Sequence, residues 1–125
     1  MKEIIVAQNA PKAIGPYSHA TAMNGMIFTS GQIGLDPETG VLAEGVEAQA
    51  RQAMTNLKNV LKTADAGMDD VVKTTVFVKD LADFAKVNAI YGSYFEGDFP
   101  ARSCVQVAAL PAGALVEVEA IAFRR

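Results

Sequence analysis

The chain is expected to adopt an α+β fold in which one mixed β-sheet carries two helices on one face. Three patterns predict it: a hairpin signal near the N-terminus, two segments with apolar residues at helical spacing, and strand-like segments around each helix. The resulting order is strand, strand, strand, helix, strand, helix, strand, strand. Two strand–helix–strand crossovers place both helices on the same face of the sheet. We expect residues 1–125 to form a single domain.

The N-terminal third is predicted to be mainly β-structure. Residues 4–6 have the composition of a short edge strand, and residues 9–17 are rich in turn formers. Two strand-like segments, 19–23 and 26–29, flank Asn24-Gly25, which is a strong signal for a tight hairpin. Residues 36–40 then indicate a β-turn, with Pro after Asp and a closing Gly.

Two helices and one central strand are predicted next. Apolar residues recur at helical spacing over 46–66, and Gly67 is the expected C-terminal cap. Residues 71–79 are dense in β-branched side chains, which indicates a strand. Asp80 is the expected cap of a second helix over 81–95, which ends before Gly97 and Pro100.

The last two segments, 99–107 and 115–123, are predicted to pair as antiparallel strands joined by residues 110–114. In one register Arg102 and Cys104 share a face with Glu117 and Glu119, whereas a slip of one residue separates Arg102 from Glu117. The loop is too long to fix this register, but the aliphatic residues between the polar ones favour the first. An arginine, a thiol and a carboxylate would then converge on one patch of the sheet.

The sheet face opposite the helices would be left uncovered. Aliphatic residues point to both faces of strand 71–79, so a fully solvated face is not expected. The sequence therefore predicts self-association through this face.

Charge and cysteine content limit the classes of function. The net charge of −3 and the scattered Lys and Arg residues argue against a nucleic-acid partner, which normally requires a basic face. A single cysteine excludes an internal disulfide and fits a reducing compartment. No segment resembles a signal peptide or a membrane span, so a cytoplasmic protein without a membrane partner is expected. No metal-ligand spacing or phosphate-loop motif is present, and neither a metal nor a cofactor is predicted.

Three residues of the last two strands could carry chemistry, and each also has a structural interpretation. Arg102 could clamp a small carboxylic acid, or pair with Glu117 or Glu119. Glu117 could hold or activate a water, or it could be an outward-facing strand carboxylate. Cys104 could be a nucleophile, but His19 is the only imidazole and lies on a distant segment, so a buried structural thiol is favoured.

Four further residues are candidates for ligand contacts. Ser30 and Gly31 end a strand, where their amides could bind an anion or form a bulge. Tyr17 could cap a pocket or only pack on the loop. Asn88 interrupts the apolar stripe of the second helix and could bind a ligand or satisfy a loop backbone.

Four motifs together closely resemble the RidA (YjgF) family. They are Gly15-Pro16-Tyr17-Ser18, Ser30-Gly31-Gln32, Pro100-Ala101-Arg102-Ser103-Cys104 and Val116-Glu117-Val118-Glu119-Ala120-Ile121-Ala122. The resemblance covers essentially the whole chain, in order. It implies a chorismate-mutase-like fold, a homotrimer around a central β-barrel, and ligand sites between subunits.

The resemblance also implies an activity without a cofactor. It is the hydrolytic deamination of the reactive enamine and imine intermediates 2-aminoacrylate, 2-iminopropanoate and 2-iminobutanoate to 2-oxo acids and ammonia. The implied roles place the substrate carboxylate on Arg102 and the amide of Cys104, and make Glu117 position or activate the water. Tyr17, Ser30, Gly31 and Asn88 would shape the pocket.

Two other functions remain open at the level of sequence. One is a non-enzymatic trimeric module that binds or senses 2-oxo acids with the same Arg102. The other is a ribonuclease, against which the acidic balance argues.

Overall fold

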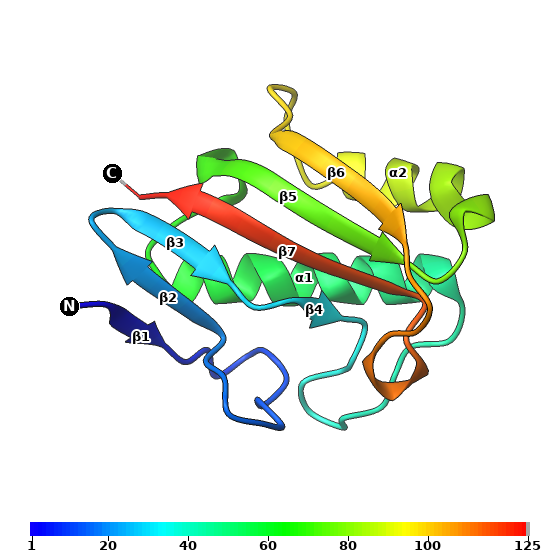
Figure 1. Ribbon diagram of the computed structural model, residues 1–125, viewed down its shortest axis with the longest axis horizontal. Coiled ribbons are helices and arrows are strands. Elements are labelled where there is room, and N and C mark those ends of the chain that lie inside the picture. Colours follow the sequence, from blue (N-terminus) through cyan, green and yellow to red (C-terminus); the bar gives the residue numbers. More distant parts are fainter. Residues whose placement is uncertain (125) are drawn as a thin grey trace.

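A computed structural model describes residues 1–124 of the chain. The fold is organised around one seven-stranded mixed sheet. The spatial order is β1–β2–β3–β7–β5–β6, with β4 also beside β7. The strands are β1 (Glu3–Ile5), β2 (Ala20–Met23), β3 (Met26–Thr29), β4 (Gln32–Ile33), β5 (Val71–Val78), β6 (Ala101–Gln106) and β7 (Val116–Phe123). Two α-helices, α1 (Val46–Thr63) and α2 (Phe84–Gly92), lie together behind the sheet (Figure 1). The predicted mixed sheet with both helices on one face is confirmed.

The N-terminal hairpin forms where the Asn-Gly signal predicts it. Strands β2 and β3 pair from Ala20–Thr29 to Met23–Met26. Asn24 and Gly25 have φ angles of 53° and 81°, the left-handed pair that suits the twist of a two-residue hairpin. The edge strand β1 begins and ends one residue earlier than predicted.

Both helices are shorter than their apolar patterns suggest. Helix α1 ends at Thr63, and the left-handed residue after it is Asp65 (φ 61°) rather than Gly67. The prediction that Gly67 caps α1 is therefore wrong: Gly67 is extended and precedes the 3-10 helix η1 (Met68–Asp70). Asp80 is confirmed as a cap, since its Oδ1 accepts a 2.9 Å hydrogen bond from the amide of Ala82. It caps the 3-10 helix η2 (Leu81–Asp83), which leads into α2.

The predicted hairpin between the last two strands is wrong. Strand β5 lies between them, pairing parallel with β6 and antiparallel with β7. The β5–α2–β6 crossover brings β6 back along the outer edge of β5. The chain then passes η3 (Pro111–Gly113) and returns as β7 on the inner side of β5 (Figure 1).

Two buried amides of α1 hold the loops at one end of the sheet. Asn56 Nδ2 donates to the carbonyl of Ile33, the last residue of β4, at 3.1 Å and to that of Leu35, just after β4, at 2.9 Å. Gln49 Oε1 accepts from the amide of Leu115, just before β7, at 2.8 Å. These bonds satisfy backbone groups that α1 covers, and they fix the segments that surround the cavity described below.

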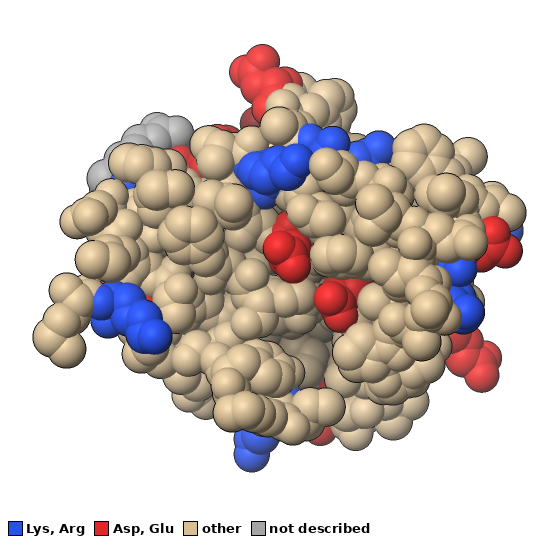
Figure 2. All heavy atoms as spheres, in the orientation of Figure 1, with Lys and Arg blue, Asp and Glu red and all other residues tan. Residues whose placement is uncertain are grey.

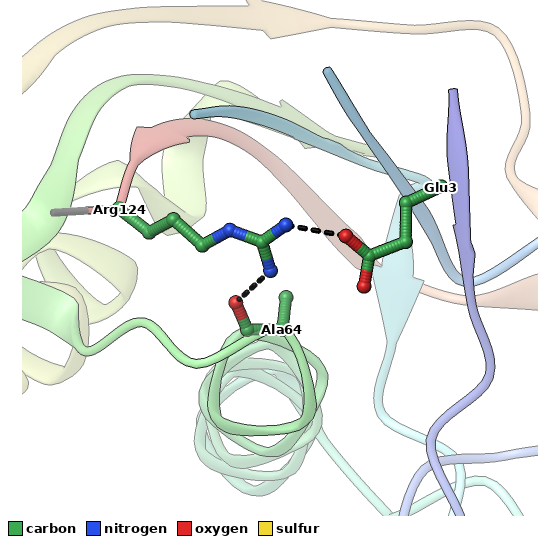
Figure 3. A network of polar contacts seen from close by, with 3 residues as sticks. All are labelled: Glu3, Ala64 and Arg124. Atoms are coloured by element: carbon green, nitrogen blue, oxygen red, sulfur yellow. Dashed lines mark hydrogen bonds and ion pairs between the residues drawn. The ribbon is translucent and has the colours of Figure 1, made fainter. Parts of the chain in front are cut away.

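A polar clasp at the opposite end joins both termini to α1. Arg124 pairs with Glu3 of β1 and donates to the carbonyl of Ala64, at the C-terminal end of α1, at 3.0 Å (Figure 3). The guanidinium thus meets the negative end of the helix dipole while closing β1 and β7 onto it.

The sheet face away from the helices is uncovered in the described chain, as predicted. Six large apolar side chains on it are exposed: Ile4, Met23, Met26, Phe28, Val105 and Phe123. We call this surface the open face. Figure 2 shows it as largely uncharged, with a few separate acidic and basic side chains.

Candidate active site

A cavity of about 350 Å³ opens where β4 and β7 meet the N-terminal loop. Four of the candidate residues line it: Tyr17, Ser30, Gly31 and Glu117. The rest of its wall is mainly apolar and comes from the N-terminal loop, the β4 segment and η3: Pro11, Lys12, Ile14, His19, Gln32, Ile33, Leu35 and Pro111. We call the four candidate residues and this cavity the acidic half-site.

Glu117 lies directly against Gly31. A Cβ atom on Gly31 would be 2.4 Å from Glu117 Oε2, so only glycine leaves room for the carboxylate in this position. Ser30 and Gly31 interrupt the line from β3 to β4, both of which pair with β7. This break in the strand is what brings backbone close to the carboxylate.

The environment of Glu117 makes its carboxylate a stronger base than an ordinary glutamate. Burial raises the pKa of its carboxyl group, and the negative charge of Glu119, two residues along the same strand face, raises it further. A carboxylate with a raised pKa is a better proton acceptor than an ordinary surface glutamate.

His19 is a residue of this wall that sequence reasoning missed. Its ring is buried, with Nδ1 accepting from the amide of Ala7 at 2.8 Å and Nε2 2.7 Å from the carbonyl of Pro11. Its carbonyl accepts from the amide of Ser30, and the carbonyl of Ser18 accepts from Ser30 Oγ. The histidine therefore ties the N-terminal loop, with Tyr17, to the strand end that carries Ser30. The sequence could not indicate this role, because a single histidine with no recognisable motif around it does not reveal which backbone groups its ring contacts.

The remaining candidates, Asn88, Arg102 and Cys104, form a second cluster on β6 and α2. Arg102 Nη1 donates to Asn88 Oδ1 at 2.6 Å, and its Cζ lies over the rings of Phe84 and Tyr91. Among residues 1–124 no carboxylate pairs with Arg102, so the proposed ion pair with Glu117 or Glu119 does not form within the chain. We call this cluster the arginine half-site.

Cys104 follows Arg102 on the same face of β6 and is half-buried against the core. Burial raises the pKa of its thiol, and the nearby positive charge of Arg102 opposes this only in part. The thiol therefore stays protonated at neutral pH, which argues against a nucleophile.

The two half-sites lie on opposite faces of the sheet, so the predicted convergence of Arg102, Cys104 and Glu117 on one patch is wrong within a single chain. In the β5–β6 register Arg102 aligns with Thr74 on the helix side, whereas Glu117 aligns with Phe77 on the open side. The error follows from the strand order. Direct antiparallel pairing of β6 with β7 would have allowed the even-numbered Arg102 and the odd-numbered Glu117 to share a face. Both strands instead pair with β5, where their partners Thr74 and Phe77 are three residues apart and therefore point to opposite faces.

Residues 1–124 contain neither a candidate metal centre nor a candidate membrane span. No three His, Cys, Asp or Glu side chains there are grouped as ligands of a metal ion would be. No helix there is long and apolar enough to cross a membrane.

Comparisons with known proteins agree over the full chain. A family model described as Endoribonuclease L-PSP matches residues 7–124. The 2-iminobutanoate/2-iminopropanoate deaminase of Salmonella typhimurium is 53% identical, with 100% of each chain covered.

Two solved Escherichia coli structures have the same fold. The YjgF gene product superposes with a TM-score of 0.95 at 51% identity, covering 98% of this chain and 99% of the other. TdcF with bound serine has a TM-score of 0.95 at 44% identity, with the same coverage. This chain therefore belongs to the endoribonuclease L-PSP family, the family of the YjgF and RidA proteins.

Proposed function

We propose that this protein hydrolyses 2-aminoacrylate, 2-iminopropanoate and 2-iminobutanoate to 2-oxo acids and ammonia. The observation that carries the proposal is a pair of groups without partners of opposite charge in the described chain. Arg102 has no carboxylate partner, and Glu117 is half-buried with no cation beside it. A 2-imino acid supplies both complements, because it has a carboxylate at one end and, next to it, a C=N group that is positively charged when its nitrogen is protonated. The same reaction is supported by the similarity of this chain, over its full length, to the Salmonella typhimurium protein named 2-iminobutanoate/2-iminopropanoate deaminase.

Each half-site has a separate task in this reaction. The Arg102 guanidinium, together with the amide of Cys104, binds the substrate carboxylate, as a planar fork of donors does well. Asn88 holds Arg102, and Tyr17, Ser30 and Gly31 close the pocket around the substrate. Glu117 holds the attacking water and accepts its proton.

The chemistry needs little beyond positioning. The water oxygen bonds to the imine carbon while its proton passes to Glu117, giving a carbinolamine. Glu117 returns the proton to the nitrogen, the carbon–nitrogen bond breaks, and ammonia leaves while the hydroxyl group gives its proton back to Glu117 and becomes the carbonyl. Holding the carboxylate and the water in fixed relation makes this attack effectively unimolecular. No cofactor enters the proposed reaction.

The half-sites become one site when two copies of the chain associate. A substrate cannot contact Glu117 and Arg102 of the same chain across the thickness of the sheet, but it can contact Glu117 of one protomer and Arg102 of the next. We therefore place the active sites between the subunits of a homotrimer with a chorismate-mutase-like fold. Its open faces meet around a central β-barrel, which would cover the six exposed apolar side chains.

The test generates imines in the assay and follows their lifetime. An amino-acid oxidase produces 2-iminobutanoate or 2-iminopropanoate, and semicarbazide traps whatever is not hydrolysed. We expect the wild-type protein to lower trapping, and Arg102→Ala and Glu117→Ala to lose this effect while remaining folded. Arg51→Ala, which removes an exposed arginine of α1, is the matched control and should behave as wild type.

Two outcomes would contradict the proposal. Unchanged turnover in Arg102→Ala would remove the clamp from the mechanism. A wild-type protein that binds 2-oxobutanoate but accelerates no imine hydrolysis would instead be a binding module for 2-oxo acids.

A further inference from the structure

Helix α2 presents three residues of one face beneath Arg102. Phe84, Asn88 and Tyr91 are spaced at i, i+4 and i+7, which places them in line along a helix. Asn88 Oδ1 accepts from Arg102 Nη1 at 2.6 Å. The Arg102 Cζ atom lies 5.3 Å from the centroid of the Phe84 ring and 5.0 Å from that of Tyr91. All three residues thus meet the same guanidinium.

Packing within the fold explains an aromatic ring at position 91 but not one at position 84. Tyr91 is buried, and its hydroxyl is 2.6 Å from that of Thr74, which is fully buried on β5. Phe84 is 39% exposed and is not part of the buried core, so core packing gives no reason for an aromatic ring there. Its contact with Arg102 gives one.

An unsupported Arg102 would be poorly ordered. It projects from β6, an edge strand, and has no carboxylate partner in the part of the chain that the structure describes. A long side chain of this kind loses considerable rotamer freedom when it binds a ligand. Rings that attract the flat face of the guanidinium reduce that loss before the ligand arrives.

We infer that Phe84 and Tyr91 are positioning residues that hold the Arg102 guanidinium ready for a substrate carboxylate. With Nη1 bound to Asn88, Nε and Nη2 have no partner among residues 1–124 and remain free to donate the paired hydrogen bonds. This inference rests on the proposed function, since it assigns the ligand of Arg102. The rings act on binding through Arg102 and do not touch the reacting carbon.

The experiment removes each ring and measures turnover and binding separately. We expect Phe84→Leu and Tyr91→Leu each to raise the KM for 2-iminobutanoate about three- to tenfold, as loss of a cation–π contact would, with a much smaller change in kcat. Phe84→Tyr and Tyr91→Phe each retain an aromatic ring and should keep the wild-type KM. The matched control is Phe95→Leu, because Phe95 packs 5.0 Å from the Tyr91 ring while no contact joins it to Arg102.

Binding of 2-oxobutanoate, measured by calorimetry, separates this inference from the proposed function. Weakening in Phe84→Leu and Tyr91→Leu but not in Phe95→Leu supports the positioning role even if the wild type hydrolyses no imine. If imines are hydrolysed and Phe84→Leu changes neither KM nor 2-oxobutanoate binding, the inference is wrong. Phe84→Leu alone decides the matter if Tyr91→Leu fails to fold, because Phe84 is exposed.

Discussion

At the scale of single residues, Gly31 leaves less room for a Cβ atom than any other glycine of the described chain, because Glu117 lies against it. The carboxylate occupies the place where any other residue at position 31 would carry its Cβ atom. The contact involves the free end of a flexible side chain, so a larger residue can be accommodated by moving the carboxylate rather than the backbone. Fold and function should therefore respond differently to a change at this position.

Gly31→Ala is expected to lower kcat for imine hydrolysis by about tenfold or more, because misplacing a catalytic group by around 1 Å can cost two orders of magnitude. The melting temperature should change little. Gly92→Ala is the control, since a Cβ there would meet only Phe99, at 3.9 Å. Wild-type kcat in Gly31→Ala would show that Glu117 does not need its observed position.

The sequence indicated which residues are candidates for the site, but it did not indicate which neighbours those residues contact in the fold. The motifs around Tyr17, Ser30, Arg102 and Glu117 were enough for a resemblance to indicate a function. The aromatic contacts of Arg102 were hidden, because Phe84 and Tyr91 fit the apolar stripe of an ordinary amphipathic helix. Their spacing about Asn88 is a signal only once the Arg102 side chain is known to lie against that face of the helix.

At the scale of elements, local signals predicted both α-helices and six of the seven strands, but they missed the two-residue β4 and gave the wrong pairing for the last two strands. Asn24-Gly25 fixes a hairpin because its turn geometry is contained in two residues. Nothing as local distinguishes β6 from β7 as the neighbour of β5. The distinction lies in burial: β7 alternates buried and half-buried residues as a central strand does, while no residue of β6 is fully buried, as suits an edge.

The alternation of β7 also couples two carboxylates, with a consequence for pH dependence. Burial first, and then the charge of Glu119, raise the pKa of Glu117. A general base must be ionised, so activity falls as the pH drops through this pKa, and the fall begins at a higher pH than for an ordinary glutamate.

Glu119→Gln removes the second cause and should lower the pKa of Glu117, moving the acid limb of the kcat/KM profile to lower pH. Glu38→Gln makes the same change in net charge at an exposed turn and should leave the profile in place. An acid limb that does not move in Glu119→Gln would mean that a group other than Glu117 controls it.

At the scale of the whole molecule, the open face and the separated half-sites point to the same conclusion. A monomer would expose six large apolar side chains and would leave Arg102 and Glu117 on opposite sides of its sheet. Both features are explained at once if the functional unit is an assembly of identical chains. The sequence predicted the uncovered face from the placement of both helices on one side of the sheet, and self-association from the aliphatic character of β5, but one chain cannot indicate the geometry in which copies meet.

The most direct test of this account is complementation between two inactive variants. Arg102→Ala retains an intact acidic half-site, and Glu117→Ala retains an intact arginine half-site. When the two are co-expressed and purified as a mixed assembly, roughly a quarter of the sites should combine two intact halves, and imine hydrolysis should return to a comparable fraction of the wild-type rate. Arg102→Ala mixed with the double variant Arg102→Ala/Glu117→Ala should stay inactive. Mixed assemblies that form but recover no activity would contradict the claim that each active site is shared between two subunits.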